Sequence, residues 1–209
     1  MENYNNEIIF RILLIGDTSV GKSSILLRYT NNNFIENSFP TLGLDFKSKK
    51  ITIGDKSITL QIWDTPGHVT TSTPPYFMYR RERVNGIIIV YDICNIESFD
   101  NVLQWVNEIN SNLLNNNELQ VQLMLLGNKT DLEYMRVVPF DRGHILARHL
   151  KIPFLETSAK TASMIDEAFL NIAQRIFLET REGTSLLQTT DTTINLHLED
   201  AGNSQGCKC

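Results

Sequence analysis

The sequence predicts an α/β fold in which a mostly parallel sheet carries helices on both faces. Short apolar segments alternate along the chain with segments of helical periodicity, and this order is typical of doubly wound α/β sheets. The apolar segments are also continuously apolar, as expected of parallel strands that are buried on both faces. In such sheets the ligand binds at the carboxyl ends of the strands. The residues that follow each strand are therefore the first candidates for function.

Six segments are expected to be strands of one sheet. Two of them flank Gly54-Asp55, a dipeptide typical of β-hairpins, so we expect one antiparallel edge strand in an otherwise parallel sheet. The expected strands are Ile8–Ile15, Leu44–Ile53, Ser57–Asp64, Gly86–Ile93, Val121–Gly127 and Pro153–Glu156.

A helical segment, Lys22–Tyr29, follows the first strand, and two later segments show the 3.6-residue apolar period of amphipathic helices. Their apolar stripes are expected to pack on the sheet as core. One stripe consists of Phe99, Val102, Leu103, Val106, Ile109 and Leu113, and the other of Ile165, Ala168, Phe169, Ile172 and Ile176.

Length and composition are those of one folded domain with a modest tail. The chain has 209 residues, of which 42 % are hydrophobic and 21 % are charged. Periodicity stops after Arg181, and the following residues are rich in Thr, Ser, Asn and Gln, as in flexible segments. We therefore expect a domain over residues 1–182 and a tail over residues 183–209.

Charge and hydropathy exclude several classes of protein. The net charge of −5 gives no electrostatic sign of nucleic-acid binding, and no apolar run is long enough to span a bilayer. The acidic start, with Glu2 after Met1, is typical neither of a signal peptide nor of N-myristoylation. We expect a cytosolic protein body that is attached to membranes only through its tail.

The strongest motif is Gly16–Ser23, which matches G-x-x-x-x-G-K-[ST] between an expected strand and an expected helix. Its main-chain N–H groups and the helix N-terminus would bind phosphate oxygens. Lys22 would neutralise the β- and γ-phosphates, and the Ser23 hydroxyl would ligate Mg²⁺. The candidate phosphate-binding residues are Gly16, Asp17, Thr18, Ser19, Val20, Gly21, Lys22, Ser23 and Ser24.

A second pair of motifs predicts which base is bound. Asn128-Lys129-Thr130-Asp131 follows an expected strand, and the Asp131 carboxylate can accept hydrogen bonds from guanine N1 and N2. Adenine lacks this donor pair, so such a site rejects it strongly. Asn128 can contact the base edge, the Lys129 stem can cover the base, and Ser158-Ala159-Lys160 can offer a main-chain N–H to the guanine oxygen. Asp131 thus disfavours an ATP-using enzyme.

With these motifs in this order, the chain resembles the Ras-superfamily small GTPases, and most closely the Rab family, over residues 8–180. Thr41–Phe46, Leu60–Thr65 and Phe154–Lys160 resemble Rab signatures. The resemblance implies a P-loop GTPase fold and a GTP/GDP switch with Mg²⁺ that acts in vesicle and membrane traffic. It also implies a monomer that meets exchange factors, GTPase-activating proteins and effectors at two switch segments.

The resemblance also assigns roles to residues outside the first motif. Phe34 should stack on the guanine, Thr41 should contact Mg²⁺ and the γ-phosphate, and Asp64 should hold the metal through water. The Gly67 N–H should meet the γ-phosphate. Phe46 and Trp63 would form part of an exposed aromatic patch that partners bind, and the alternative for these two aromatics is simple hydrophobic packing.

The second switch departs from the family. Rab proteins usually read Asp-Thr-Ala-Gly-Gln, whereas this chain reads Asp64-Thr65-Pro66-Gly67-His68, so His68 replaces the glutamine that orients the attacking water. One interpretation is slow hydrolysis, in the extreme a constitutively GTP-bound module that binds effectors. The other is that a partner supplies the catalytic groups and His68 is tolerated. The implied catalytic set is His68 with Lys22, Thr41 and Gly67.

The tail resembles the doubly prenylated ends of Rab proteins because the chain ends Cys207-Lys208-Cys209. A single lipid usually needs a second membrane signal, often a polybasic patch, and residues 184–206 contain no Lys or Arg. We therefore expect two prenyl groups and binding by a prenyl-binding escort protein or GDI. The expected location is the cytoplasmic face of an intracellular or plasma membrane, with a cytosolic pool.

Overall fold

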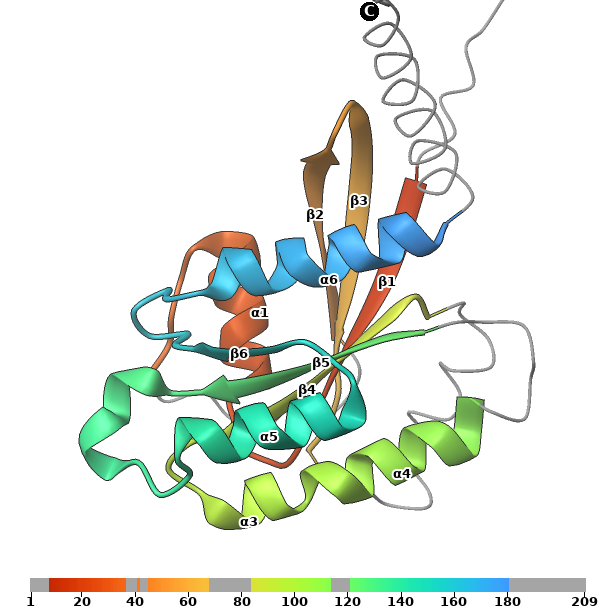
Figure 1. Cartoon of the computed structure of the whole chain (residues 1–209). Helices are drawn as coiled ribbons and strands as arrows, with labels where there is room; N and C mark the ends of the chain where they lie inside the picture. Colours follow the sequence, from red (N-terminus) through yellow and green to blue (C-terminus); the bar gives the residue numbers. More distant parts are fainter. Residues whose placement is uncertain (1–7, 37–40, 42–44, 68–83, 114–120, 181–209) are drawn as a thin grey trace, which may run out of the picture. The chain divides into compact units, whose positions relative to one another are not determined.

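The computed structural model describes residues 8–36, 41, 45–67, 84–113 and 121–180 of the chain. Six strands form one sheet of order β2-β3-β1-β4-β5-β6 (Figure 1). Only β2 runs antiparallel to its neighbour β3, and the other pairs are parallel, so the predicted fold class is confirmed. The strands are β1 (Ile8–Ile15), β2 (Asp45–Ile53), β3 (Lys56–Asp64), β4 (Gly86–Asp92), β5 (Gln122–Asn128) and β6 (Phe154–Thr157).

Helices cover both faces of this sheet (Figure 1). The helix α1 (Lys22–Asn31) and the start of α6 (Ile165–Glu179) lie on one face, and α3 (Ile96–Asp100), α4 (Val102–Leu113) and α5 (Phe140–Leu150) lie on the other. A 3₁₀-helix, η1 (Thr130–Met135), follows β5. None of the helices in the part of the chain that the structure describes is long and apolar enough to cross a membrane.

Contacts divide the chain into two units, Met1–Ile176 and Phe177–Cys209. In the second unit the structure describes the last turn of α6 and Thr180, whose main-chain N–H donates to the Phe177 carbonyl oxygen. The tail, with Cys207 and Cys209, lies outside the described residues.

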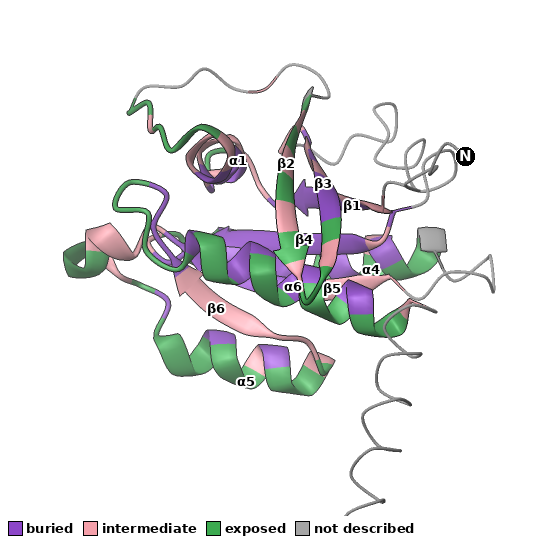
Figure 2. Cartoon of the chain, turned by 90° about the horizontal axis from the view of Figure 1, so that it is seen from above, coloured by how far each residue is buried: buried purple, intermediate pink, exposed green. Residues whose placement is uncertain are grey.

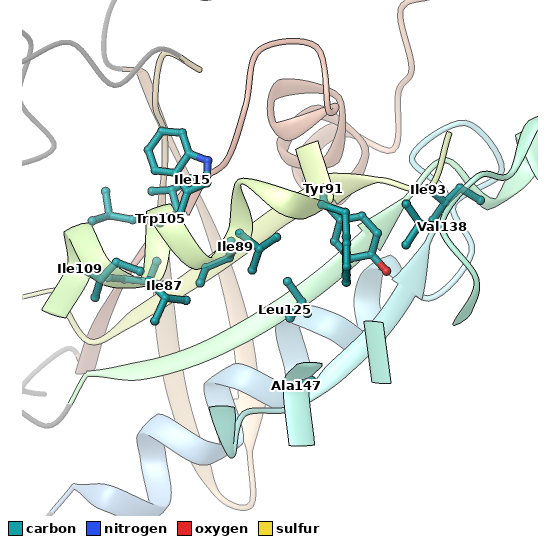
Figure 3. Close-up of a cluster of buried hydrophobic side chains, with 14 of the residues drawn as sticks. Ile15, Ile87, Ile89, Tyr91, Ile93, Trp105, Ile109, Leu125, Val138 and Ala147 are labelled. Atoms are coloured by element: carbon teal, nitrogen blue, oxygen red, sulfur yellow. The ribbon is translucent and has the colours of Figure 1, made fainter. Parts of the chain in front are cut away.

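The central strands are buried, as their continuous apolar character predicts. All seven residues of β4 are buried, and Figure 2 shows the burial along β1 and β4. In the core cluster of Figure 3, Ile87 and Ile89 of β4 pack with Trp105 of α4, while Leu125 of β5 packs with Ala147 of α5. This packing fixes the directions in which the strands and the loops after them leave the sheet.

The predicted stripe on α4 is partly wrong. Leu103, expected in the core, is 49 % exposed, whereas Trp105, which the stripe omitted, is 4 % exposed. Successive helical residues are about 100° apart, so Leu103 lies about 100° round the helix from the buried Val102 and about 120° from the buried Ile109. The indole N–H of Trp105 donates to the Asp17 carboxylate at 2.8 Å, which connects that side of α4 with the loop after β1. The five predicted stripe residues of α6 are all buried.

Tyr91 on β4 gives a test of this packing. Its hydroxyl is buried and finds no hydrogen-bond partner among the described residues, and burial raises the pKa of Tyr91 well above its usual value. Because an unpaired buried hydroxyl destabilises a protein, Tyr91→Phe should leave the free energy of unfolding unchanged or raise it by about 1 kcal/mol. Urea denaturation measures this change.

The matched control is a substitution that adds an atom beside the Tyr91 hydroxyl and leaves the hydroxyl in place. A Cβ at Gly143 would lie 2.5 Å from the Tyr91 hydroxyl and 2.6 Å from Cζ of Phe154, so Gly143→Ala should lower the free energy of unfolding by about 1–3 kcal/mol through overpacking. A comparable loss in Tyr91→Phe would show that the hydroxyl has a partner and would contradict the prediction.

Candidate nucleotide-binding site

A pocket of about 410 Å³ lies where β1, β3, β5 and β6 end. This volume is in the range of small-molecule and cofactor sites. Its walls come from the segments after β1, α1, β3, β5 and β6, which lie far apart in the sequence. The lining residues are Thr18, Ser19, Gly21, Lys22, Ser23, Ser24, Phe34, Glu36, Thr41, Thr65, Gly67, Asn128, Lys129, Asp131, Leu132, Ala159 and Lys160.

The segment Gly16–Ser23, called the phosphate loop below, depends on glycine at both ends. Gly16 has φ 135° and Gly21 has φ 100°, a backbone region that other residues rarely adopt. A Cβ at Gly16 would collide with the Val90 carbonyl oxygen, and one at Gly21 would collide with the Asn128 side-chain amide. The loop therefore passes directly against β4 and β5, with its N–H groups near the pocket.

Lys22 begins α1 and is 5 % exposed. Its ammonium group donates to the carbonyl oxygens of Gly16 at 2.7 Å and Asp17 at 2.8 Å. Burial lowers the pKa of Lys22 to about 8, against the opposing charges of Asp64 and Asp17. A bound anion would favour the protonated form. Lys22 is thus a positive charge that is already positioned at the wall of the pocket.

Three oxygen-bearing side chains meet beside Lys22 and match the chemistry of a magnesium site. The hydroxyls of Ser23 and Thr41 are 2.8 Å apart. Ser23 donates to Oδ2 of Asp64, and Thr41 donates to the same atom at 3.1 Å. Mg²⁺ prefers oxygen ligands, commonly one or two protein groups completed by phosphates and water. No cluster of three His, Cys, Asp or Glu that could hold a metal occurs among the described residues.

Asn128, at the end of β5, is 1 % exposed, and its side chain bonds to two segments at the pocket. Its amide nitrogen donates to the Val20 carbonyl oxygen at 2.9 Å. Its amide oxygen accepts from the Thr157 hydroxyl and from the Ala159 main-chain N–H, both at 3.3 Å. One side chain thereby connects the phosphate loop with the end of β6.

The other predicted base-binding residues are also held by partners. Lys129 forms an ion pair with Asp92 at 2.7 Å and has a left-handed φ of 75°. Asp131 accepts a hydrogen bond from the Ser158 hydroxyl. Asp131 lies on the pocket wall, whereas Ser158 is fully buried behind it.

Lys160 reaches Glu36 at 2.8 Å across the mouth of the pocket. The hydrogen bond from Lys160 lowers the pKa of Glu36. Phe34, which precedes Glu36 by two residues, is half-buried and lines the pocket. The segment after α1 and the loop after β6 therefore meet at the same edge.

Most of the predicted site residues that the structure describes line the pocket, and five of the described ones lie outside its lining: Gly16, Asp17, Val20, Asp64 and Ser158. The Asp17 carboxylate accepts from Asn101 and Trp105, each at 2.8 Å. Three lining residues were missed, Glu36, Thr65 and Leu132. Thr65 and Leu132 directly follow predicted residues in the sequence, whereas no motif points to Glu36.

The two predicted patch aromatics stack, with ring centroids 4.5 Å apart. Phe46 is 46 % exposed, whereas Trp63 is partly buried and packs against the core cluster. Phe46 thus fits the predicted exposed patch, whereas Trp63 fits the alternative of hydrophobic packing. Gly67 lies against the phosphate loop, since a Cβ there would collide with the main chain of Thr18. His68 lies outside the described residues.

Comparisons with known proteins agree with this geometry. A sequence model of the Ras family matches residues 11–178. The chain is 46 % identical over 170 residues to Ras-related protein RABD1 of Arabidopsis thaliana, and the matched residues cover 81 % of this chain and 80 % of the relative. It is 44 % identical over 174 residues to Ras-related protein RIC1 of Oryza sativa subsp. japonica, or 83 % of both. It is 38 % identical over 199 residues to Ras-related protein Rab-13 of Rattus norvegicus, or 95 % of both. The chain therefore belongs to the Ras superfamily of small GTPases and, within it, to the Rab family.

Proposed function

We propose that this Rab-family chain is a GTP/GDP switch of vesicle and membrane traffic that hydrolyses GTP slowly. The observation that carries the proposal is that a buried lysine, Lys22, and a carboxylate, Asp131, line one pocket although they are 109 positions apart in the sequence. The first suits the phosphates and the second suits the base. Neither group alone would define a guanine nucleotide.

Phosphate binding would involve the N–H groups of the phosphate loop, the N-terminus of α1 and the Lys22 ammonium group. Ser23 and Thr41 would ligate Mg²⁺ directly, and Asp64 would do so through water. When bound, Mg²⁺ would neutralise charge on the phosphates. This role fits the mutual approach of the three side chains around Asp64 Oδ2.

Base binding would involve Asp131, which would accept hydrogen bonds from guanine N1 and N2. The Ala159 N–H would donate to the guanine oxygen, while Phe34 and the Lys129 stem would cover the two faces of the base. Ser158 supports the role of Asp131, because its hydrogen bond holds the carboxylate at the pocket wall.

Hydrolysis would transfer the γ-phosphoryl group to water, breaking its bond to the β-phosphate and releasing GDP and phosphate. Thr41 and Gly67 would contact the γ-phosphate from the two switch segments, and its loss would release both segments. Partners would then distinguish the two states by their different affinities. Exchange factors, GTPase-activating proteins and effectors are the expected partners.

The base assignment is tested by the nucleotide that co-purifies with the protein and by competition. We expect GDP or GTP with Mg²⁺, and GDP should compete far better than ADP. Asp131→Asn should weaken GDP binding by about a hundredfold or more, because the amide cannot accept both hydrogen bonds, and should improve binding of xanthosine diphosphate. Asp141→Asn on the exposed face of α5 is the matched control. A wild-type protein with no magnesium-dependent affinity for GDP or GTP would overturn the proposal.

The hydrolysis rate is tested at His68. If the missing glutamine limits the reaction, His68→Gln should accelerate single-turnover hydrolysis of bound GTP by about tenfold or more, with nucleotide affinity unchanged. His144→Gln, on the exposed face of α5, controls for the loss of a histidine. Equal rates in wild type and His68→Gln would contradict slow hydrolysis by this cause. Negligible turnover in both, even with activating proteins, would favour a constitutively GTP-bound module.

Membrane attachment is tested at the tail. Cys207→Ser with Cys209→Ser should move the protein from the membrane fraction to the cytosol, because both expected prenyl groups are lost. Cell fractionation measures the distribution. Cys94→Ser, which changes a half-buried thiol near the end of β4, is the control and should stay with membranes. Continued membrane binding of the double variant would refute prenylation as the anchor.

A further inference from the structure

Arg28, on the last turns of α1, makes four hydrogen bonds at the base end of the pocket. Its Nε donates to the Ala159 carbonyl oxygen at 2.8 Å, and Nη2 donates to the Lys160 carbonyl oxygen at 2.9 Å. Its Nη1 donates to both the main-chain and the side-chain oxygen of Asn32, each at 3.1 Å. A single guanidinium group therefore joins α1, the residue that ends it and the loop after β6.

All four acceptors are uncharged, and three of them are main-chain carbonyl oxygens. No carboxylate forms an ion pair with Arg28 among the residues that the structure describes. Hydrogen bonds from a charged donor are roughly twice as strong as neutral ones, and the planar guanidinium fixes the directions of its donors. Arg28 thus orients peptide groups in place of pairing with an opposite charge.

The two loop carbonyls belong to residues that line the pocket. Binding the oxygens of Ala159 and Lys160 fixes the two peptide planes on either side of the Lys160 Cα, because each peptide group is planar. The path of the loop at the pocket wall is then determined on the side away from the ligand. Ala159 offers its N–H at this wall, where it now donates to Asn128.

The other arm of Arg28 fixes a second segment, the one that follows α1. Asn32 ends α1 in a left-handed conformation with φ 50°, and its N–H donates to the Arg28 carbonyl oxygen at 3.0 Å. The chain continues from Asn32 to Phe34 and Glu36, which both line the pocket. The side chain and main chain of Arg28 therefore set where this segment leaves the helix.

We propose that Arg28 is a positioning residue that holds the two walls of the base end together and so sets the selectivity for the purine 6-oxygen. The inference rests on the proposed binding of a guanine nucleotide. Arg28 itself is not among the residues that line the pocket. It acts through the Ala159–Lys160 loop, whose N–H would meet the 6-oxygen, and through the segment that carries Phe34.

A purely structural brace would behave differently. Its loss would lower stability and weaken every ligand by the same factor. A positioning residue instead changes the ratio between two ligands that differ only at the contacted atom. The diagnostic pair is GDP and 6-thioguanosine diphosphate, which keeps the N1–H, the 2-amino group, the sugar and both phosphates but replaces the 6-oxygen by sulfur, a weaker hydrogen-bond acceptor.

The experiment compares Arg28→Lys with wild type. Lysine keeps the charge and the stem but cannot bind both loop carbonyls in the planar fork geometry. GDP should dissociate about tenfold faster, as expected for the loss of one or two charge-assisted hydrogen bonds. Affinity for the 6-thio analogue should fall by clearly less than affinity for GDP. The selectivity ratio, which is the affinity for GDP divided by the affinity for the analogue, should therefore shrink by about threefold or more.

Two further variants keep the test decisive. Asn32→Gly removes only the side-chain acceptor of Nη1 and tolerates the left-handed backbone, so it should shift the ratio in the same direction by a smaller factor. Arg148→Lys makes the same substitution as Arg28→Lys on the exposed face of α5 and should change neither quantity. Asn32→Gly carries the test if Arg28→Lys does not fold.

The outcomes separate this inference from the proposed function. A wild-type protein that binds GDP, with Arg28→Lys and Asn32→Gly keeping its selectivity ratio, would overturn the positioning role alone. Equal losses for both ligands would also overturn it. A wild-type protein that binds neither GDP nor GTP would overturn the proposed function itself.

Discussion

The buried amide of Asn128 is the interaction on which the rest of the site depends. Its nitrogen binds the Val20 carbonyl of the phosphate loop, and its oxygen accepts from Thr157 and Ala159 at the end of β6. Asn128 is 1 % exposed, so removing its amide would leave its buried partners without their hydrogen bonds. The sheet order makes this brace possible, because the parallel strands β1, β4, β5 and β6 end at one edge. The separation between the phosphate end and the base end is thus set by the sheet.

An anion site in a chain of net charge −5 requires that nearby carboxylates be engaged elsewhere. Asp17 belongs to the phosphate loop, yet its carboxylate is held by the N–H groups of Asn101 and Trp105. Glu36, on the pocket wall, is paired with Lys160. The burial that lowers the pKa of Lys22 also keeps solvent away from its ammonium group. The attraction between this group and a bound anion is therefore screened only weakly. The charge at the pocket wall therefore depends on how the nearby carboxylates are paired and does not follow from the net charge of the chain.

Much of this could be predicted because local rules act strongly in short apolar strands and glycine-containing loops. The predicted β1 agrees with the observed strand at both ends, and the hairpin around Gly54-Asp55 is confirmed. The helix α5 was not predicted, and its buried residues, Gly143 and Ala147, are small. Leu103 was misassigned and Trp105 was omitted because the apolar pattern did not show which side of α4 packs on the sheet. In the structure Trp105 belongs to the core cluster and donates to Asp17, 88 positions away. Contacts of this kind, including Arg28 with Ala159, depend on the assembled sheet and leave no pattern in the sequence.

The two ends of the pocket are held by different kinds of contact. At the base end, Arg28, Asn128 and the Lys129–Asp92 ion pair hold the walls through main-chain and buried side-chain contacts. At the phosphate end, Thr41 is connected through side-chain hydroxyl contacts with Ser23 and Asp64, groups that a metal ion would engage in their place. A change in the number of phosphates would therefore rearrange contacts at Thr41 and leave the base walls as they are. A protein built in this way can hold GDP and GTP by the same base contacts while the difference between them acts only on the switch segments.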